Sequence, residues 1–137
     1  MSQYRRYDEV SVGDVFPPQP LTFAVTSDVV DRFYRATGDD DAVRKGPSRK
    51  APSMIASIYL VDLLMARGSP PGGIHAKQSI RFHRSLAVGE DLSLQATVVD
   101  KYVRKERPYV VSEFEARGND GCLVSSGRIT SIWGRDQ

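Results

Sequence analysis

The feature that most constrains this chain is the segment from Met54 to Met65, in which nearly every side chain is apolar. A helix over residues 51–66 has almost no polar face, so other parts of the protein must cover it. Ser57 and Asp62 interrupt the segment, and it is too short to cross a bilayer, which takes about 20 apolar residues. We therefore predict a long helix buried inside a single domain spanning residues 1–137.

The remainder of the chain predicts strands that could enclose this helix. A strand at Leu21–Thr26 and a helix that ends at Gly38 precede it, and four alternating apolar segments follow it. Those segments are Ala76–His83, Leu92–Val98, Val110–Ala116 and Leu123–Trp133. We predict that these four strands form a meander, and that the fold class is α+β, with the long helix wrapped by a curved antiparallel sheet.

Composition and missing motifs exclude several classes of function. Lys plus Arg number 19 and Asp plus Glu number 17, and the net charge of +2 is too small to indicate nucleic-acid binding. The single cysteine, Cys122, cannot form an internal disulfide and suggests a reducing compartment. The N-terminus has no signal sequence, so we expect a cytoplasmic protein that does not associate with membranes. No metal-ligand pattern or cofactor motif is present, and we predict neither a metal nor a cofactor.

The sharpest charge contrast in the chain lies between the two predicted helices. Asp39, Asp40 and Asp41 come first, and a basic group follows. That group consists of Arg44, Lys45, Arg49 and Lys50. Neighbouring carboxylates disfavour one another's ionised form, which suits a group that must exchange protons, and the bases could bind phosphates. The alternative is a solvated loop whose acids only cap the preceding helix.

Several segments, taken in order, resemble the MaoC-like branch of the hot-dog fold family. They include Val12-Gly13-Asp14, the helix that ends in Thr37-Gly38-Asp39, and the strand and turn from Ser79 to Asp91. The resemblance implies an (R)-specific enoyl-thioester hydratase or a 3-hydroxyacyl dehydratase of fatty-acid or polyketide metabolism. It also implies an acyl-CoA or acyl-carrier-protein substrate, and a homodimer or a heterodimer with a related hot-dog subunit.

The catalytic segment of that family, G-D-x-N-P-x-H, is only partly matched here. Asp39 occupies the Asp position, Asp41 the Asn position and Arg44 the His position. The family's H-G-M at the start of the buried helix is Pro52-Ser53-Met54 in this chain. The segment from Ala51 onward instead resembles the A-P-P-T-F segment in the degenerate half of two-part dehydratases. A non-catalytic, acyl-binding partner subunit is therefore an alternative.

Adding water to an enoyl thioester requires a base, an acid and donors for the thioester oxygen. Arg44 cannot exchange protons, because its pKa lies above 12. We therefore assign the catalytic role to Asp39, with Asp40 and Asp41 beside it. The backbone N–H groups of Ser53 and Met54, at the start of the helix, would hold the thioester oxygen.

Further residues are candidates for binding the substrate. Arg44 could contact the phosphates of the carrier, Ser57 and Tyr59 could line the pocket, and Phe33 could lie near the acyl chain. His83 could be a replacement acid or base, or simply a side chain on the strand surface. A thioesterase or a polyketide cyclase-type enzyme on the same fold remains a further alternative.

Overall fold

The computed structural model describes residues 4–38, 50–52, 54–55 and 60–135. A short 3-10 helix, Tyr7–Glu9, precedes the first strand. The strands are β1 Val15–Ala24, β2 Lys50–Ala51, β3 Ile74–Phe82, β4 Leu86–Ala87, β5 Asp91–Arg104, β6 Arg107–Arg117 and β7 Leu123–Ile132. The described helices are α1 Ser27–Ala36 and α3 Leu60–Met65.

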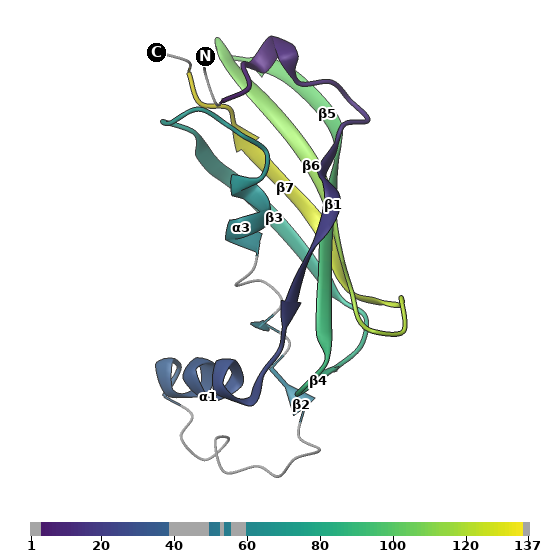
Figure 1. Ribbon diagram of the computed structural model, residues 1–137. Helices are drawn as coiled ribbons and strands as arrows, with labels where there is room; N and C mark the ends of the chain where they lie inside the picture. The colour runs from purple at the N-terminus through teal and green to yellow at the C-terminus, as the bar shows by residue number, and fades with distance from the viewer. Residues whose placement is uncertain (1–3, 39–49, 53, 56–59, 136–137) are drawn as a thin grey trace.

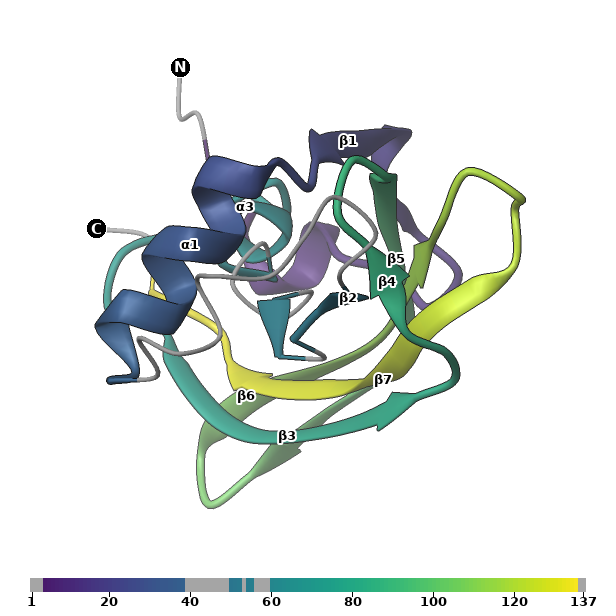
Figure 2. The ribbon, with the colours of Figure 1, turned by 90° about the horizontal axis from the view of Figure 1, so that it is seen from below.

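Five strands form one antiparallel sheet in the order β1-β5-β6-β7-β3, and β2 pairs with β4 in a separate small sheet. Seen from below in Figure 2, the large sheet curves around α3, and α1 lies across one end of the molecule. The predicted curved antiparallel sheet is therefore confirmed. Figure 1 shows the long strands β5, β6 and β7 running from the end that carries α1 to the end that carries both termini.

The core lies on the concave face of this sheet. Leu92, Leu94, Ala96 and Val98 alternate along β5 with partly exposed residues and are at most 3% exposed. Phe114 on β6 pairs with Ala96 and is buried beside them. From α3, Leu60 and Leu63 join the same cluster. Residues of opposite parity form the convex face, which is polar along most of its length.

The last four strands do not form a meander, contrary to the prediction. Strands β5, β6 and β7 follow one another as predicted, but β3 pairs with β7 at the far edge, from Ile74↔Ile132 to Phe82↔Ser125. Local alternation identifies a strand and its buried face, but it does not specify which neighbour the strand pairs with. The chain therefore crosses from one side of the sheet to the other through β4.

The predicted helix over residues 51–66 is also wrong at its start. Ala51 belongs to β2 and pairs with Leu86, because the proline that follows it, Pro52, disfavours the helical conformation at Ala51. Helical residues are described at Ile55 and over Leu60–Met65. The sheet does not enclose this region on all sides, since Met65 is 74% exposed.

Two further strands are longer than expected. Strand β1 begins at Val15 and runs through Pro17, Pro18 and Pro20, with an irregularity in its pairing to β5 between Phe16 and Leu21. Proline is tolerated there because β1 is an edge strand whose outer N–H groups need no partner. The segment Lys101–Arg107, which lies between two predicted strands, is mostly β-ladder, since β5 continues to Arg104 and β6 begins at Arg107.

Helix α1 is capped by a side chain at its start. Thr26 Oγ1 accepts a hydrogen bond from the backbone N–H of Val29 at 3.1 Å, and Asp28 lies in the first turn, where a negative charge is favourable. Val30 is fully buried. In the part of the chain described here, no helix has the length and apolar character needed to cross a membrane.

Candidate functional site

The candidate site is at the end of the molecule where α1, β2 and β4 lie together (Figure 1). Most of the residues predicted for it lie outside the described residues, and their positions stay predictions. They are Asp39, Asp40, Asp41, Arg44, Ser53, Ser57 and Tyr59. What the structure does describe is how the segments on either side of them are held.

The chain enters the acidic segment from the end of α1. Thr37 Oγ1 donates to the carbonyl oxygens of Phe33 at 3.1 Å and Tyr34 at 3.2 Å, which ends the helix. Gly38 then adopts a φ of +81°, a left-handed conformation that suits glycine at this position. Phe33 is half-buried against the core, with its ring edge-on to Tyr34 at 6.3 Å. The position that precedes Asp39 is therefore fixed by packing and capping.

The chain leaves that segment through β2. Lys50 pairs with Ala87, and Ala51 pairs with Leu86. After Pro52, the N–H of Ile55 donates to the Pro52 carbonyl at 3.0 Å, and the Ile55 side chain is fully buried. Met54 is 50% exposed at the same place. Strand β4 thus holds the segment from which the thioester-binding N–H groups were predicted to come.

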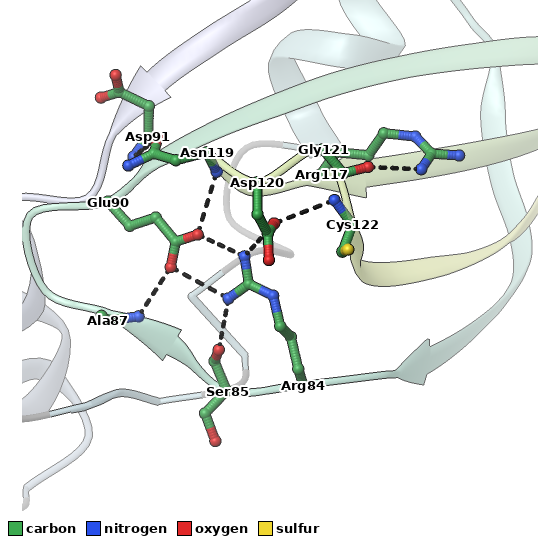
Figure 3. A network of polar contacts seen from close by, with 10 residues as sticks. All are labelled: Arg84, Ser85, Ala87, Glu90, Asp91, Arg117, Asn119, Asp120, Gly121 and Cys122. Atoms are coloured by element: carbon green, nitrogen blue, oxygen red, sulfur yellow. Dashed lines mark hydrogen bonds and ion pairs between the residues drawn. The ribbon is translucent and has the colours of Figure 1, made fainter.

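A polar network fixes β4 in turn (Figure 3). The Glu90 carboxylate accepts hydrogen bonds from both terminal nitrogens of Arg84, from the Ala87 N–H at 3.2 Å and from the Asn119 N–H at 3.1 Å. Arg84 Nη2 also donates to Asp120 at 3.0 Å. The network therefore joins the turn after β4 to the β6–β7 hairpin.

The charges of this network stabilise one another. The hydrogen bonds with Arg84 hold the pKa of Glu90 below its usual value, with the Ala87 and Asn119 N–H groups adding to the effect. The pKa of Asp120 is also lowered, first by the Cys122 N–H and then by Arg84. The Glu90 hydrogen bond in turn raises the pKa of Arg84. All three groups are therefore ionised near neutral pH, and their role is to hold the turn in place.

Sequence reasoning missed this network. The sequence predicts a turn over Ala87–Asp91 and a hairpin turn over Asn119–Gly121, and the structure has turns at Val88–Gly89 and at Asn119–Asp120. Arg84 links these two turns, which lie about thirty residues apart in the chain, so no local sequence pattern indicates the link. Gly118 gave a weak signal, since a Cβ there would overlap the side chains of Arg84 and Glu90.

His83 lies on the polar, convex face of the sheet. Its Nε2 is hydrogen-bonded to Ser126 Oγ at 2.8 Å. Ser126 pairs with Arg81 and Glu115, so it belongs to the polar, convex face of the sheet. The helix packs on the opposite face, and the structure therefore does not bring His83 together with Met54. Among the described residues, no group of His, Cys, Asp or Glu side chains is arranged to hold a metal ion.

No protein-family model and no curated protein matches the sequence. Solved structures do match it. The unliganded R-hydratase PhaJ1 from Pseudomonas aeruginosa aligns with a TM-score of 0.78 at 20% identity, over 95% of this chain and 86% of that one. A MaoC-like dehydratase from Rhodospirillum rubrum aligns with a TM-score of 0.73 at 18% identity, over 95% and 97% of the two chains.

A third match is a chain of a protein complex. The C-terminally truncated HadBC complex of Mycobacterium tuberculosis, a 3R-hydroxyacyl-ACP dehydratase, has a chain that aligns with a TM-score of 0.69 at 18% identity. The alignment covers 90% of this chain and 98% of that one. These likenesses, together with the curved five-stranded sheet, confirm the predicted hot-dog fold.

Proposed function

We propose that this chain is an acyl-thioester hydratase or dehydratase in which Asp39 transfers the protons. The observation that carries the proposal is the match of at least nine-tenths of the chain to an R-hydratase and to two dehydratases. The structure supports it in a second way, because the segments flanking residues 39–49 are held at one end of the sheet. That is where an acidic side chain and the start of the central helix would meet.

In the proposed hydration, the Asp39 carboxylate removes a proton from water as the water oxygen bonds to C3 of the enoyl thioester. The electron pair of the C2–C3 double bond moves toward the thioester carbonyl, whose oxygen becomes negative. The backbone N–H groups of Ser53 and Met54 stabilise that oxygen. Protonated Asp39 then returns the proton to C2, which completes the addition of one water molecule. Dehydration is the same sequence in reverse.

The neighbouring residues have supporting roles in this proposal. Asp40 and Asp41 disfavour the ionised form of Asp39 and so make it a better proton carrier. Arg44 binds phosphate on CoA or on the carrier-protein arm, because a guanidinium pairs well with phosphate oxygens. Ser57 and Tyr59 line the substrate pocket. His83 is left out, because it is bonded to Ser126 on the convex face.

The edge of the large sheet formed by β3 supports association with another chain. That strand runs from Ile74 to Phe82 without a proline, and its outer side has no partner within the described part of the chain. Ile74 is 48% exposed and Phe82 is 38% exposed, so apolar surface accompanies the unpaired backbone. We propose that β3 pairs with a second copy or with a related hot-dog subunit.

A second candidate function is a non-catalytic partner subunit that binds the acyl chain. Arg44 at the family's His position and the Ala51-Pro52-Ser53-Met54 segment favour it. A chain in the two-subunit HadBC complex has the same fold, which makes such an arrangement plausible for this fold. In that case the other subunit would supply the acid and the base.

Hydration of crotonyl-CoA by the purified chain tests the proposal. Enoyl absorbance should fall, and Asp39→Asn should lower the rate about 10²- to 10⁴-fold, the usual contribution of a positioned acid–base group. Asp28→Asn is the matched control, because Asp28 is exposed on α1 and, among the described residues, pairs with Arg32 at 3.1 Å. The control should keep the wild-type rate.

The other outcomes point to the alternatives. Release of free thiol without loss of the enoyl group would indicate a thioesterase. An inactive chain that raises turnover when mixed with a hot-dog subunit carrying Asp and His would favour the partner-subunit function. Equal rates for wild type and Asp39→Asn would refute the role of Asp39.

A further inference from the structure

Arg67, just after α3, is a partly buried cation with no carboxylate partner among the described residues. Its Nε donates to the Leu64 carbonyl at 3.1 Å, and its Nη1 donates to Ser131 Oγ at 2.7 Å. The guanidinium also lies over the Trp133 ring, 5.3 Å from its centroid. Burial lowers the pKa of Arg67 to about 10. Among the described residues, the partners of Arg67 are therefore dipoles and an aromatic ring, and none of them carries a negative charge.

Other partly buried arginines in this protein are neutralised. Arg84 pairs with Glu90 and Asp120, and Arg5 pairs with Asp14 at 2.6 Å. Removing a cation from water without a counter-charge is costly, so a buried charge is usually paired. A structural clamp between α3 and β7 would explain the bonds from Nε and Nη1. It does not explain why Nη2 has no hydrogen bond within the described residues.

Arg67 lines a hollow of about 410 Å³ formed with the loop Gly68–Gly73 and with His75. A second hollow, of about 300 Å³, shares Pro71, Gly72 and Ile74 with the first and is lined by Arg107 and Arg135. In the parts of the chain that the structure describes, neither hollow is lined by an Asp or a Glu. Three arginines therefore line adjoining depressions that have no acidic side chain.

The loop that separates the hollows is held in place. The Gly68 carbonyl accepts from the Arg5 N–H at 2.8 Å, and Ser69 Oγ accepts from the Gly134 N–H at 3.3 Å. A Cβ on Gly134 would overlap the Pro70 carbonyl, so the loop packs directly on the backbone that follows β7. The hollows are thus preformed, which reduces the entropy lost when a ligand binds.

We propose that these hollows form a binding site for a small ligand with two oxyanion groups, either phosphates or carboxylates. One group binds Nη2 of Arg67, which has no hydrogen-bond partner among the described residues, and the other binds Arg107 and Arg135. Guanidinium forms paired hydrogen bonds with both kinds of oxyanion. The site lies at the end of the sheet opposite α1 (Figure 1), so it does not depend on the proposed thioester chemistry.

Trp133 provides the test, because it is the only tryptophan in the chain and lies against Arg67. Its fluorescence is followed as inorganic pyrophosphate or succinate is added to the full-length protein. Sodium chloride holds the ionic strength constant. A saturable change is expected with at least one probe. Tighter binding of pyrophosphate identifies a phosphate ligand, and tighter binding of succinate identifies a dicarboxylate.

Variants separate a site from general charge attraction. Arg67→Gln should weaken binding at least tenfold, and so should the double variant Arg107→Gln/Arg135→Gln. Because Arg107 and Arg135 are exposed, the double variant should fold even if Arg67→Gln does not. Arg128→Gln removes an exposed arginine paired with Glu113 on the convex face and should bind like wild type. A response linear in anion concentration, or equal affinities for wild type and the double variant, would overturn the proposal.

Discussion

Replacing Glu90 by Gln tests whether the network around Arg84 holds β4 in place. The carboxylate accepts on each of its oxygens from one Arg84 nitrogen and one backbone N–H. Whichever way the new amide is turned, its NH₂ group faces two donors, so two hydrogen bonds are lost. Hydrogen bonds to charged groups contribute about 1.5–3 kcal/mol each. The Glu90 side chain is only 12% exposed.

Two such bonds would contribute about 3–6 kcal/mol, and we expect the Glu90→Gln variant to be destabilised by about 3 kcal/mol, the lower end, because Arg84 keeps Asp120 as a partner. For a domain of this size that corresponds to a fall in Tm of about 10 °C. The control is Glu115→Gln, whose pair with Arg117 at 2.9 Å has side chains 54% and 44% exposed. Exposed pairs contribute about 0–1 kcal/mol. Both variants would be compared with wild type by urea unfolding and by thermal melts.

The difference in stability between wild type and Glu90→Gln should depend on pH. Since the pKa of Glu90 is lowered in the folded state, its contribution is complete above the ordinary value of 4.5. It is then lost as the pH falls through the lower, folded-state pKa. The gap between wild type and Glu90→Gln should therefore narrow in acid. A stability of Glu90→Gln equal to that of Glu115→Gln, or a gap that does not change between pH 6 and pH 3, would refute this account.

Two further substitutions test the local packing. Thr26→Ala removes the cap on the Val29 N–H and should cost about 1 kcal/mol in the free energy of unfolding, with Thr22→Ala as an exposed control in the same urea titration. Gly127→Ala would place a methyl group over the Ser79 carbonyl oxygen and 2.9 Å from the Phe114 ring, so it should cost about 3 kcal/mol. A Gly127→Ala protein as stable as wild type would show that β3 and β7 separate easily there.

Local signals predicted much of this fold. The alternation along β5 and β6 identified which residues face the core, and Gly38 marked the end of α1. These features depend on side-chain periodicity and capping, which act over a few residues. The resemblance added the order of the segments and, with it, the hot-dog fold.

The errors have a shared physical origin, which is pairing between distant segments. Strand β3 lies beside β7, and β2 is held by β4, and neither partner can be read from the strand itself. The Arg84 network and the unpaired charge of Arg67 likewise depend on residues from other parts of the chain. For the candidate site, the sequence indicates which residues could take part. The described structure adds how Gly38 and Ala51, on either side of them, are held in place.

The contrast between the two outer strands of the sheet limits what the protein can assemble into. On β1, Pro17, Pro18 and Pro20 lack the N–H groups that another strand would need. If β3 pairs with β3 of a second copy, that pairing occupies the edge of the described sheet to which a further strand would add. Assembly then stops at the dimer. The protein can therefore have an unpaired β3 strand at its edge without forming filaments.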